Sequence, residues 1–353
     1  MSAPINVALV GYGYVGKVFH APLLAHTPGL RLHTVVSGDA GKVHADFPDA
    51  RVVDDPQAAF ADDAIDLVVI AAPNAVHAPL AIAALQAGRH VVVDKPFTTS
   101  LDEARRVVAA AEEAQRIVSV FQNRRWDADF LALRALVEDG ALGEVAELHS
   151  HFDRFRPQVP DRWRERAGPG AGLWFDLGPH LVDQALQLFG LPLSVQADIA
   201  VQREGAVVDD FFHVLLRYPR LRVVLHAGAL VPASGLRFAA HGTRGSFTKR
   251  GLDAQEAMLK DGIVPGSPGW GRDPSPGTLV RIVDGVPIES VFDGVAGDYR
   301  AFYAAMRDAI LGGGEAPVTT QQALDVMRLL EAGAASAVEG RATGLDSWIA
   351  PAA

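Results

Sequence analysis

The chain of 353 residues contains no cysteine. This absence excludes disulfide bonds, thiolate nucleophiles and cysteine-ligated zinc sites, and it is compatible with a reducing compartment. Residues 1–6 show neither the basic nor the apolar segment of a signal peptide, and no apolar run is long enough to span a bilayer. We therefore expect a cytoplasmic protein without a membrane partner.

Basic residues are fewer than acidic ones: the chain has 32 lysines and arginines and 42 aspartates and glutamates, which gives a net charge of −10. No basic tract is present, so we expect no nucleic-acid partner. The twelve histidines fall in no metal-binding spacing and no acidic calcium loop occurs, so we expect no metal site. An anionic ligand must then be held by local groups rather than by the overall field.

A glycine-rich turn is the most informative motif that the sequence does contain. It reads G-x-G-x-x-G and lies between an apolar β-prone run and an apolar helical pattern. In a dinucleotide-binding turn the first glycine permits the tight turn, the second admits the pyrophosphate, and the third lets the helix pack on the strand. The alternative is a turn that binds nothing. We expect cofactor contacts from Gly11, Tyr12, Gly13, Tyr14, Val15 and Gly16.

Strand-like and helix-like runs alternate through the first third of the chain. Strands are expected at residues 5–10, 30–36, 65–71, 90–94 and 117–121, and helices at 15–25, 79–87 and 100–114. Repeated β–α units with short connections produce a parallel sheet with right-handed crossovers. The sequence therefore predicts an α/β protein whose N-terminal domain is a doubly wound Rossmann sheet.

The pattern changes near residue 124. Runs that favour strands follow at residues 145–155, 195–203, 211–218, 221–229, 237–241, 279–283 and 288–292, with helices at 127–138, 176–189, 297–311 and 320–337. Consecutive strands with few helices favour a large open, mostly antiparallel sheet. We expect a dinucleotide-binding domain over residues 1–123 and a second α/β domain over residues 124–353.

Lys95 lies directly after the expected strand at residues 90–94. Doubly wound folds bind ligands at the carboxyl ends of their strands, and a lysine among apolar neighbours loses part of its preference for the charged form. Lys95 is therefore a candidate for proton exchange beside the cofactor, and its neighbours Asp94 and Pro96 are expected to contact the cofactor as well. A cis peptide bond at Pro96 would fix the direction of the Lys95 side chain. The alternative is a surface lysine in a turn.

Asp176 and His180 are four residues apart, so they share one face of a helix. Because proline fits only the first turn of a helix, Pro179 leads us to expect this pair at a helix N-terminus. A histidine and a carboxylate placed there can act as a general base and its orienting partner. The alternative is a capping aspartate and a packed histidine.

Other polar residues follow the expected strands or lie near the domain junction. Cofactor contacts are expected from Ala72, Pro73, Asn74, His77 and Asn123. Substrate contacts are expected from Arg124, Arg154 and Trp163. For Ala72, Pro73, Asn74 and His77 the alternative is a simple helix entry. For Asn123 and Arg124 it is a salt-bridged hinge, and for Arg154 and Trp163 it is a solvated face.

Taken together, these motifs resemble those of the Gfo/Idh/MocA oxidoreductase family. The matching patterns are Gly11-x-Gly13-x-x-Gly16, Pro73-Asn74-x-x-His77, Asp94-Lys95-Pro96 and Gly172-x-x-x-Asp176-x-Gly178-x-His180. They occur in the family's order and cover roughly residues 5–340. Residues 121–127, 176–190 and 202–204 are similar to the branch that contains NADP-dependent scyllo-inositol dehydrogenase. The chain departs from the family at Asp94, where glutamate is common, so we expect an adjusted position of the acid.

The resemblance implies that Lys95, Asp176 and His180 form the catalytic set and also contact the substrate. It implies an NAD(P)-dependent oxidoreductase that interconverts a secondary alcohol and a ketone of a polyol, cyclitol or sugar. It further implies that the exposed face of the second sheet forms an interface in a homodimer or homotetramer.

The residues after the second strand bear on the choice between NADP and NAD. NAD-dependent domains usually carry an acid at this strand end, which binds the ribose 2′-hydroxyl. Ser37 and Gly38 stand there instead, and Lys42 is near enough along the chain to meet a 2′-phosphate. This pattern resembles NADP-binding members of the family and predicts NADP. If the strand runs two residues further, Asp39 becomes the ribose ligand and NAD the cofactor.

Two other functions remain open from the sequence. A non-catalytic dinucleotide-binding regulator could share the fold, although it would not need Lys95, Asp176 and His180 together. A reductase of a non-sugar carbonyl or a dihydrodiol would need them, but Asn123 and the arginines favour a hydroxyl-rich substrate.

Overall fold

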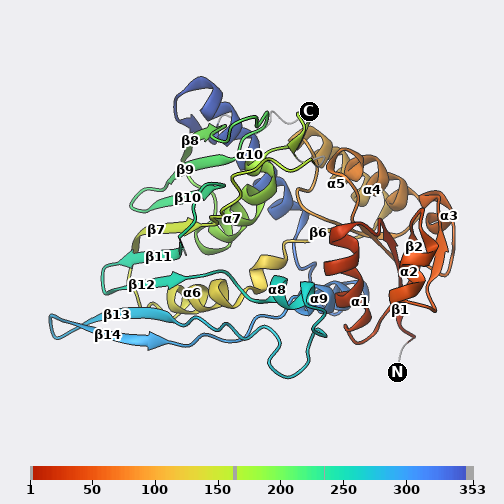
Figure 1. Ribbon diagram of the computed structural model, residues 1–353, viewed down its shortest axis with the longest axis horizontal. Helices are drawn as coiled ribbons and strands as arrows, with labels where there is room; N and C mark the ends of the chain where they lie inside the picture. Colours follow the sequence, from red (N-terminus) through yellow and green to blue (C-terminus); the bar gives the residue numbers. More distant parts are fainter. Residues whose placement is uncertain (1–2, 162–164, 234, 347–353) are drawn as a thin grey trace. The chain divides into compact units, whose positions relative to one another are not determined.

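A computed structural model describes residues 3–161, 165–233 and 235–346. The chain divides into two compact units, and Figure 1 labels those of their elements for which there is room. Unit 1 comprises residues 1–126, 255–271 and 298–324, and unit 2 comprises residues 127–254, 272–297 and 325–353. Unit 1 therefore includes two segments that come from late in the chain.

Unit 1 is built on a six-stranded parallel sheet in the order β3-β2-β1-β4-β5-β6. Its strands are β1 (Ile5–Val10), β2 (Leu30–Val36), β3 (Arg51–Val53), β4 (Leu67–Ile70), β5 (His90–Val93) and β6 (Val118–Val120). Its helices are α1 (Ala21–Ala25), α2 (Ala40–Asp46), α3 (Pro56–Phe60), α4 (His77–Gln86), α5 (Leu101–Ala114), α8 (Gln255–Lys260) and α9 (Arg300–Ile310), with a π-helical turn at Gly16–His20 and 3-10 turns at Asn74–Val76 and Asn123–Trp126. This strand order confirms the doubly wound Rossmann sheet.

Local sequence explains the elements of unit 1. Every residue of β4 is apolar and buried, as a parallel strand covered on both faces requires. In α5, the buried residues Leu101, Ala104 and Val108 recur every three or four positions, so one face packs inward. The Ser100 side chain accepts a hydrogen bond from the Glu103 backbone N–H at 3.2 Å, which caps the first turn as the sequence predicts.

The late segments complete the core of unit 1. The Phe121 ring, just beyond β6, lies 5.0 Å from Phe302 and 5.5 Å from Tyr303 of α9 between ring centroids. The Tyr303 hydroxyl lies 2.5 Å from Nδ1 of His20. All three aromatic residues are buried, so α9 supplies packing that the first 126 residues do not contain.

Unit 2 is built on a nine-stranded sheet in the order β14-β13-β12-β11-β7-β10-β9-β8-β15. Its strands are β7 (Val145–His151), β8 (Ser194–Ala200), β9 (Phe211–Arg217), β10 (Arg222–Gly228), β11 (Leu236–Gly242), β12 (Gly245–Arg250), β13 (Gly277–Val283), β14 (Val286–Phe292) and β15 (Thr343–Gly344). Among these neighbours only β7 and β10 are parallel. The expected large, mostly antiparallel sheet is confirmed.

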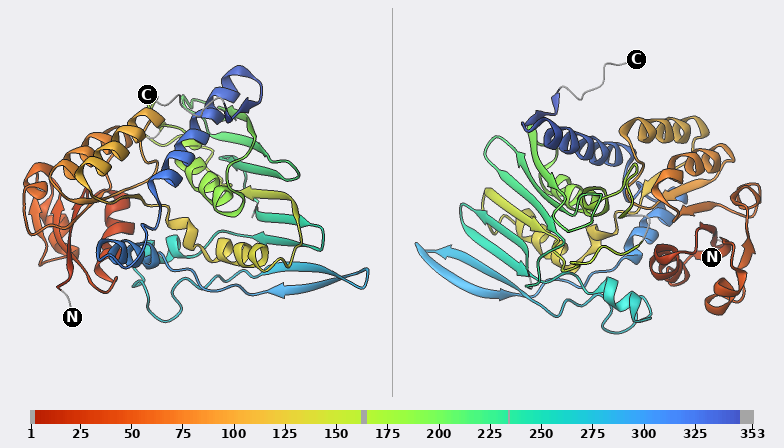
Figure 2. Two further views of the ribbon diagram at one scale, coloured as in Figure 1. Left: turned by 180° about the vertical axis from the view of Figure 1, so that it is seen from behind. Right: turned by 45° about the horizontal axis from the view of Figure 1, so that its top comes forward.

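Helices cover one face of this sheet. They are α6 (Ala128–Glu138), α7 (Leu173–Phe189) and α10 (Thr320–Glu339), and Figure 2 shows them on the same side of the strands. On β9, Phe212 and Val214 are buried toward α7, whereas His213 alternates to the opposite face. That opposite face, called the open face below, carries no helix of unit 2 among the described residues.

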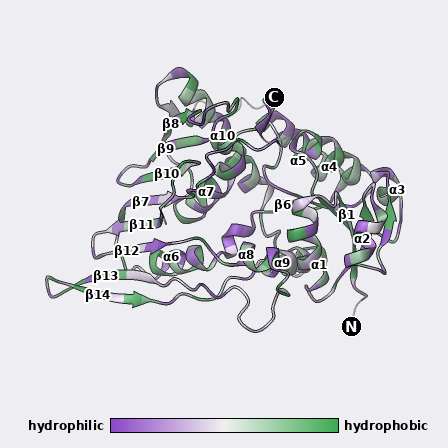
Figure 3. Ribbon diagram, viewed as in Figure 1, coloured by the Kyte–Doolittle hydropathy of each residue, from purple (hydrophilic) through white to green (hydrophobic). Residues whose placement is uncertain are grey.

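The β13–β14 hairpin exposes apolar side chains. Ile282, Val286, Ile288 and Val291 are all about half exposed or more, and Figure 3 shows the hydropathy of this hairpin residue by residue. The register of the hairpin places Ile282 and Val291 on one face and Val286 and Ile288 on the other. Exposed apolar side chains at a sheet edge favour an interaction surface.

Three details of unit 2 differ from the sequence prediction. Helix α7 begins at Leu173, so Pro179 lies inside the helix rather than in its first turn. Strand β7 ends at His151, and only an isolated bridge between Phe155 and Leu230 continues it. Strand β12 was not expected; its Lys249 is buried because it pairs with Asp273 at 3.0 Å.

None of the helices in the described part of the chain combines the length and the apolar character that a membrane span needs.

Candidate functional site

The glycine-rich turn follows β1 directly. Gly11 has φ = +98°, and a Cβ on it would lie 2.4 Å from the Ala71 carbonyl oxygen. A Cβ on Gly16 would lie 2.1 Å from the Gly11 carbonyl oxygen. The fold itself therefore requires glycine at these two positions. A Cβ on Gly13 would meet no atom within 4 Å, so the space next to Gly13 is open.

This contrast gives a prediction for Gly13. We expect Gly13→Ala to fold normally and to weaken dinucleotide binding at least about tenfold, or roughly 1.4 kcal/mol, because the new methyl group occupies the approach to the backbone. Gly16→Ala is the matched control and should lower the melting temperature, since its Cβ overlaps a backbone carbonyl. Calorimetric titration with the dinucleotide and thermal melts separate the effects, and unchanged affinity in Gly13→Ala would contradict this role.

The end of β2 places the residues that bear on NADP. The strand ends at Val36, so Ser37 is the first residue beyond it, as expected. The Asp39 carboxylate accepts a hydrogen bond from the Lys42 backbone N–H at 2.9 Å and caps α2. The Lys42 ammonium donates to the Tyr12 carbonyl oxygen at 3.0 Å, which brings it back to the glycine-rich turn. A lysine cation beside the glycine-rich turn suits an anionic ligand.

The loops after β4 and β5 are held together by His77. Its buried ring lies 2.9 Å from the Pro96 carbonyl oxygen and 2.9 Å from the Ala72 carbonyl oxygen. Asn74 is buried in the same segment, and the Lys95–Pro96 peptide bond is cis. The predicted cofactor residues after these two strands therefore lie at neighbouring strand ends of one sheet.

Asp94 lies beneath Lys95 in a buried polar group. Its Oδ1 is 3.8 Å from Nε2 of His20, which is an electrostatic contact rather than a hydrogen bond. Burial alone would raise the pKa of Asp94, but His20 and the charge of Lys95 hold that pKa below its ordinary value. Lys95 itself is only half buried.

Two residues at the end of unit 1's sheet are engaged inside the unit. Asn123 is buried, and the buried Arg124 donates to Glu256 Oε2 at 2.8 Å. This ion pair accounts for the burial of Arg124 without a substrate. Its substrate contact stays a prediction, as does the cofactor contact of Asn123.

Unit 2 contains a pocket next to the start of α7. The space within it is about 510 Å³, a figure that includes its open mouth. Its lining includes Asp176, Arg154, Arg203 and Asp209. The Arg154 guanidinium lies 4.9 Å from the centre of the Phe152 ring, a geometry that holds the cation over the aromatic face.

The predicted catalytic residues divide between the two units. Lys95 belongs to unit 1, and Asp176 and His180 belong to unit 2. Asp176 lies in the first turn of α7 and lines the pocket, whereas the buried His180 lies one turn further on and is absent from the lining. Trp163 lies outside the described residues.

Asp209 is a pocket residue that the sequence reasoning missed. Its Oδ2 accepts a hydrogen bond from the Trp174 backbone N–H at 2.6 Å, so it caps α7 from another segment. A Cβ on Gly172 (φ = +88°) would lie 1.9 Å from Asp209 Oδ1, so glycine is needed for this approach. Burial raises the pKa of Asp209 to about 6 despite these bonds, and the neighbouring Asp210 adds to the rise.

Asp210 has a different environment from Asp209. It receives hydrogen bonds from the buried Arg203 at 2.8 Å, and Arg203 also contacts Glu165 at 2.7 Å. Burial would raise the pKa of Asp210, but the Arg203 contact lowers it overall. The two adjacent aspartates therefore lose their protons at different pH values. Of the two, only Asp209 can exchange a proton near neutral pH.

The raised pKa of Asp209 predicts a pH-dependent stability. A carboxyl group whose pKa is higher in the folded state stabilises the fold below its unfolded pKa, and this contribution is lost as the pH rises through about 6. The rise from 3.8 to about 6 corresponds to about 3 kcal/mol above that range. We therefore expect Asp209→Asn to be more stable than the wild type at pH 8 and nearly equal to it at pH 4.

Urea denaturation at the two pH values measures this difference. Asp139→Asn, which changes an exposed carboxylate of the same unit, should alter the stability little at either pH. A gain for Asp209→Asn that does not depend on pH would contradict the prediction.

The parallel six-stranded sheet and the glycine-rich turn after its first strand define unit 1 as an NAD(P)-binding Rossmann unit. The chain belongs to the Gfo/Idh/MocA oxidoreductase family. The family's "NAD-binding Rossmann fold" matches residues 5–122, and its "C-terminal alpha/beta domain" matches residues 134–345.

Relatives with similar length support this membership. The chain is 53% identical over 337 residues to the uncharacterized oxidoreductase YdgJ of Escherichia coli, covering 96% of this chain and 97% of the relative. It is 38% identical over 344 residues to scyllo-inositol 2-dehydrogenase (NADP(+)) IolW of Bacillus subtilis, covering 97% and 96%. An oxidoreductase structure from Yersinia pestis matches with a TM-score of 0.95 and 48% identity, covering 100% and 99%.

Proposed function

We propose that the protein interconverts a secondary alcohol and a ketone of a polyol, cyclitol or sugar, with NADP as its cofactor. The observation that carries the proposal is the pocket of unit 2, in which Asp176 at the start of α7 lies among arginines. Hydroxyl-rich molecules need several hydrogen-bonding groups around one cavity, and this lining offers both donors and acceptors. The similarity to IolW supports a cyclitol of the scyllo-inositol type.

The residues of the chain fit a bound dinucleotide. Gly13 leaves room for the pyrophosphate, and Ser37, Gly38 and Lys42 would hold the ribose phosphate. Two features favour NADP over NAD: β2 ends before Ser37, and the Asp39 carboxylate is engaged in capping α2. When bound, the nicotinamide supplies the acceptor and donor of hydride.

We assign the proton chemistry to three side chains. His180 takes the proton of the reacting hydroxyl as general base. Lys95 hydrogen-bonds the same oxygen and stabilises the negative charge that develops on it, with Asp94 supporting its ammonium form. Asp176 binds a neighbouring hydroxyl or orients His180, consistent with its place on the pocket wall.

Steady-state rates test the proposal directly. Inositol isomers, aldoses and their keto forms are each assayed with NADP and with NAD by absorbance of the reduced nicotinamide. We expect turnover with at least one cyclitol or sugar and a higher kcat/KM with NADP. Tight dinucleotide binding without turnover of any of these compounds would contradict the proposal and favour a regulator or a reductase of another bond.

We also propose that the macromolecular partner is a second copy of the chain, in a homodimer or homotetramer. The open face of the sheet and the exposed apolar side chains of the β13–β14 hairpin support this, because burial against a copy would remove them from water. A monomer in sedimentation equilibrium would contradict it.

A further inference from the structure

Three potential metal ligands converge on the open face of unit 2. His151 ends β7, and His226 is its direct partner in the parallel pairing of β7 with β10. Asp153 follows His151 by two residues, so it returns to the same face of the extended chain. The residues between and beyond them, Phe152 and Arg154, alternate to the other face and line the pocket.

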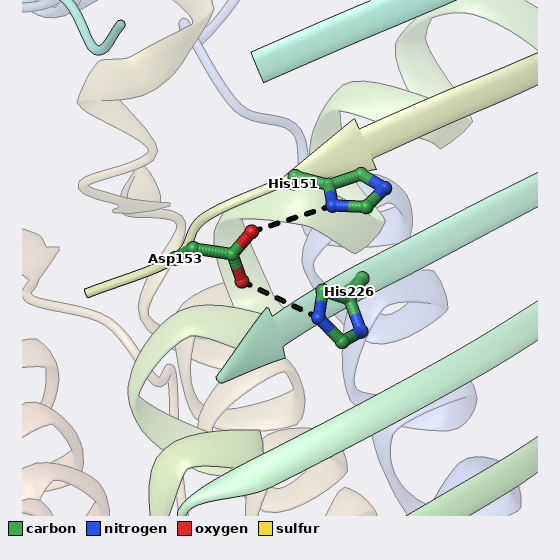
Figure 4. Close-up of side chains that lie close together, drawn as sticks. All are labelled: His151, Asp153 and His226. Atoms are coloured by element: carbon green, nitrogen blue, oxygen red, sulfur yellow. Dashed lines mark hydrogen bonds and ion pairs between the residues drawn. The ribbon is translucent and has the colours of Figure 1, made fainter. Parts of the chain in front are cut away.

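The ligand atoms are arranged around one point, as Figure 4 shows. His151 Nδ1 lies 3.4 Å from Asp153 Oδ2, and His226 Nε2 lies 3.4 Å from Asp153 Oδ1. One ligand atom from each residue lies within 4.8 Å of the others. Each separation involves a different oxygen of Asp153, so its carboxylate lies between the two imidazole rings.

Outer contacts hold two of these side chains in place. The Gly228 backbone N–H donates to Asp153 Oδ1 at 3.0 Å. Nδ1 of His226 lies 3.4 Å from Nδ1 of His213, on the neighbouring strand β9. When His226 donates in this contact, its Nε2 is unprotonated and faces the carboxylate, which is the form that binds a metal. Such second contacts are typical of metal-binding histidines and carboxylates.

We propose that His151, Asp153 and His226 bind a divalent transition-metal ion of the zinc type, with water completing the coordination. Two imidazoles and one carboxylate are ligands that this class of ion accepts. The bound ion links the carboxyl ends of β7 and β10. Arg154 follows β7 and Gly228 ends β10, and both residues line the pocket. An ion bound on the open face would therefore hold one wall of the pocket in place.

Cobalt(II) is the probe for the test, since its visible absorbance reports coordination geometry. The full-length protein, free of any histidine tag and treated with EDTA, is titrated with Co²⁺ and then with Zn²⁺. We expect one equivalent of Co²⁺ to give the intense absorbance of a four-coordinate site, and Zn²⁺ to displace it. Absence of saturable absorbance in the wild type, or the weak spectrum of a hexa-aqua ion only, would overturn the proposal.

Variants locate the ion on these residues. The double variant His151→Gln with His226→Gln should bind Co²⁺ at least a hundredfold more weakly. His241→Gln, which alters another histidine of the open face that contacts Ser246, should bind like the wild type. Equal loss in both variants, or no loss in the double variant, would overturn the assignment.

Thermal melts provide a second measurement that does not depend on the variants' basal stability. Zn²⁺ should raise the melting temperature of the wild type and of His241→Gln and leave that of the double variant unchanged. Equal shifts in all three proteins would mean non-specific binding and overturn the proposal.

Discussion

Replacing Lys95 by methionine is expected to lower kcat about 10²- to 10⁴-fold with the best polyol substrate, the range that positioned acid–base groups contribute. Methionine keeps the length of the side chain but cannot hydrogen-bond or stabilise an alkoxide. The dissociation constant of the dinucleotide should change little, because in our proposal the glycine-rich turn and the residues after β2, rather than Lys95, hold its phosphates. Single-turnover hydride transfer and dinucleotide titration measure the two quantities separately.

The matched control for Lys95→Met is Arg106→Met. Arg106 lies exposed on α5 of the same unit, so its loss removes one positive charge without touching the strand ends. Its kcat should equal that of the wild type. His180→Ala should resemble Lys95→Met, and unchanged turnover in both Lys95→Met and His180→Ala would refute their proposed roles.

Replacing Arg237 by leucine is expected to destabilise unit 2 by about 3–5 kcal/mol. Arg237 lies inside the unit with only 1% of its side chain exposed, and its Nε donates to Asp129 at 3.0 Å. It also donates to Gln184 Oε1 at 2.8 Å and to Ser150 Oγ at 3.1 Å. Leucine leaves the fully buried Asp129 carboxylate without this cation, which is costlier than the loss of the pair itself.

A double variant distinguishes these two costs. Arg237→Leu with Asp129→Leu removes the buried charge together with its partner, and it should recover much of the stability lost in Arg237→Leu. Arg341→Leu, in the mostly exposed pair with Glu339, should change the free energy of unfolding by less than about 1 kcal/mol. Urea denaturation followed by circular dichroism measures all three, and a loss in Arg237→Leu no larger than in Arg341→Leu would contradict the prediction.

The sequence predicts the parts of the fold that depend on short-range patterns. The apolar run at β4 and the spacing of Gly11, Gly13 and Gly16 each have a local physical cause, so they identify the Rossmann unit without a structure. The predicted start of α7 was wrong, because the prediction placed Pro179 in the first turn of the helix. Packing of α7 against β9 and β10 outweighs the one backbone hydrogen bond that this proline removes.

Two of the missed features depend on contacts between segments that are distant in the sequence. Asp209 follows no motif, and its raised pKa arises only because the chain folds it against the N-terminus of α7. The pairing of His151 with His226 depends on β7 and β10 being neighbours, although 75 residues separate the two histidines. Strand order in an open sheet is set by tertiary packing, so spacing along the chain cannot predict such clusters.

Unit 1 cannot complete its core early in synthesis, because α9 belongs to this unit but comes late in the chain. A ribosome-bound chain that ends before Tyr303 lacks the aromatic side chains that pack on Phe121 and His20. The Rossmann sheet can form earlier, but its hydrophobic interior stays partly exposed until α9 has left the exit tunnel. Nascent chains of intermediate length should therefore bind chaperones through the N-terminal third that is made first, and an N-terminal fragment of 126 residues should aggregate where the whole chain does not.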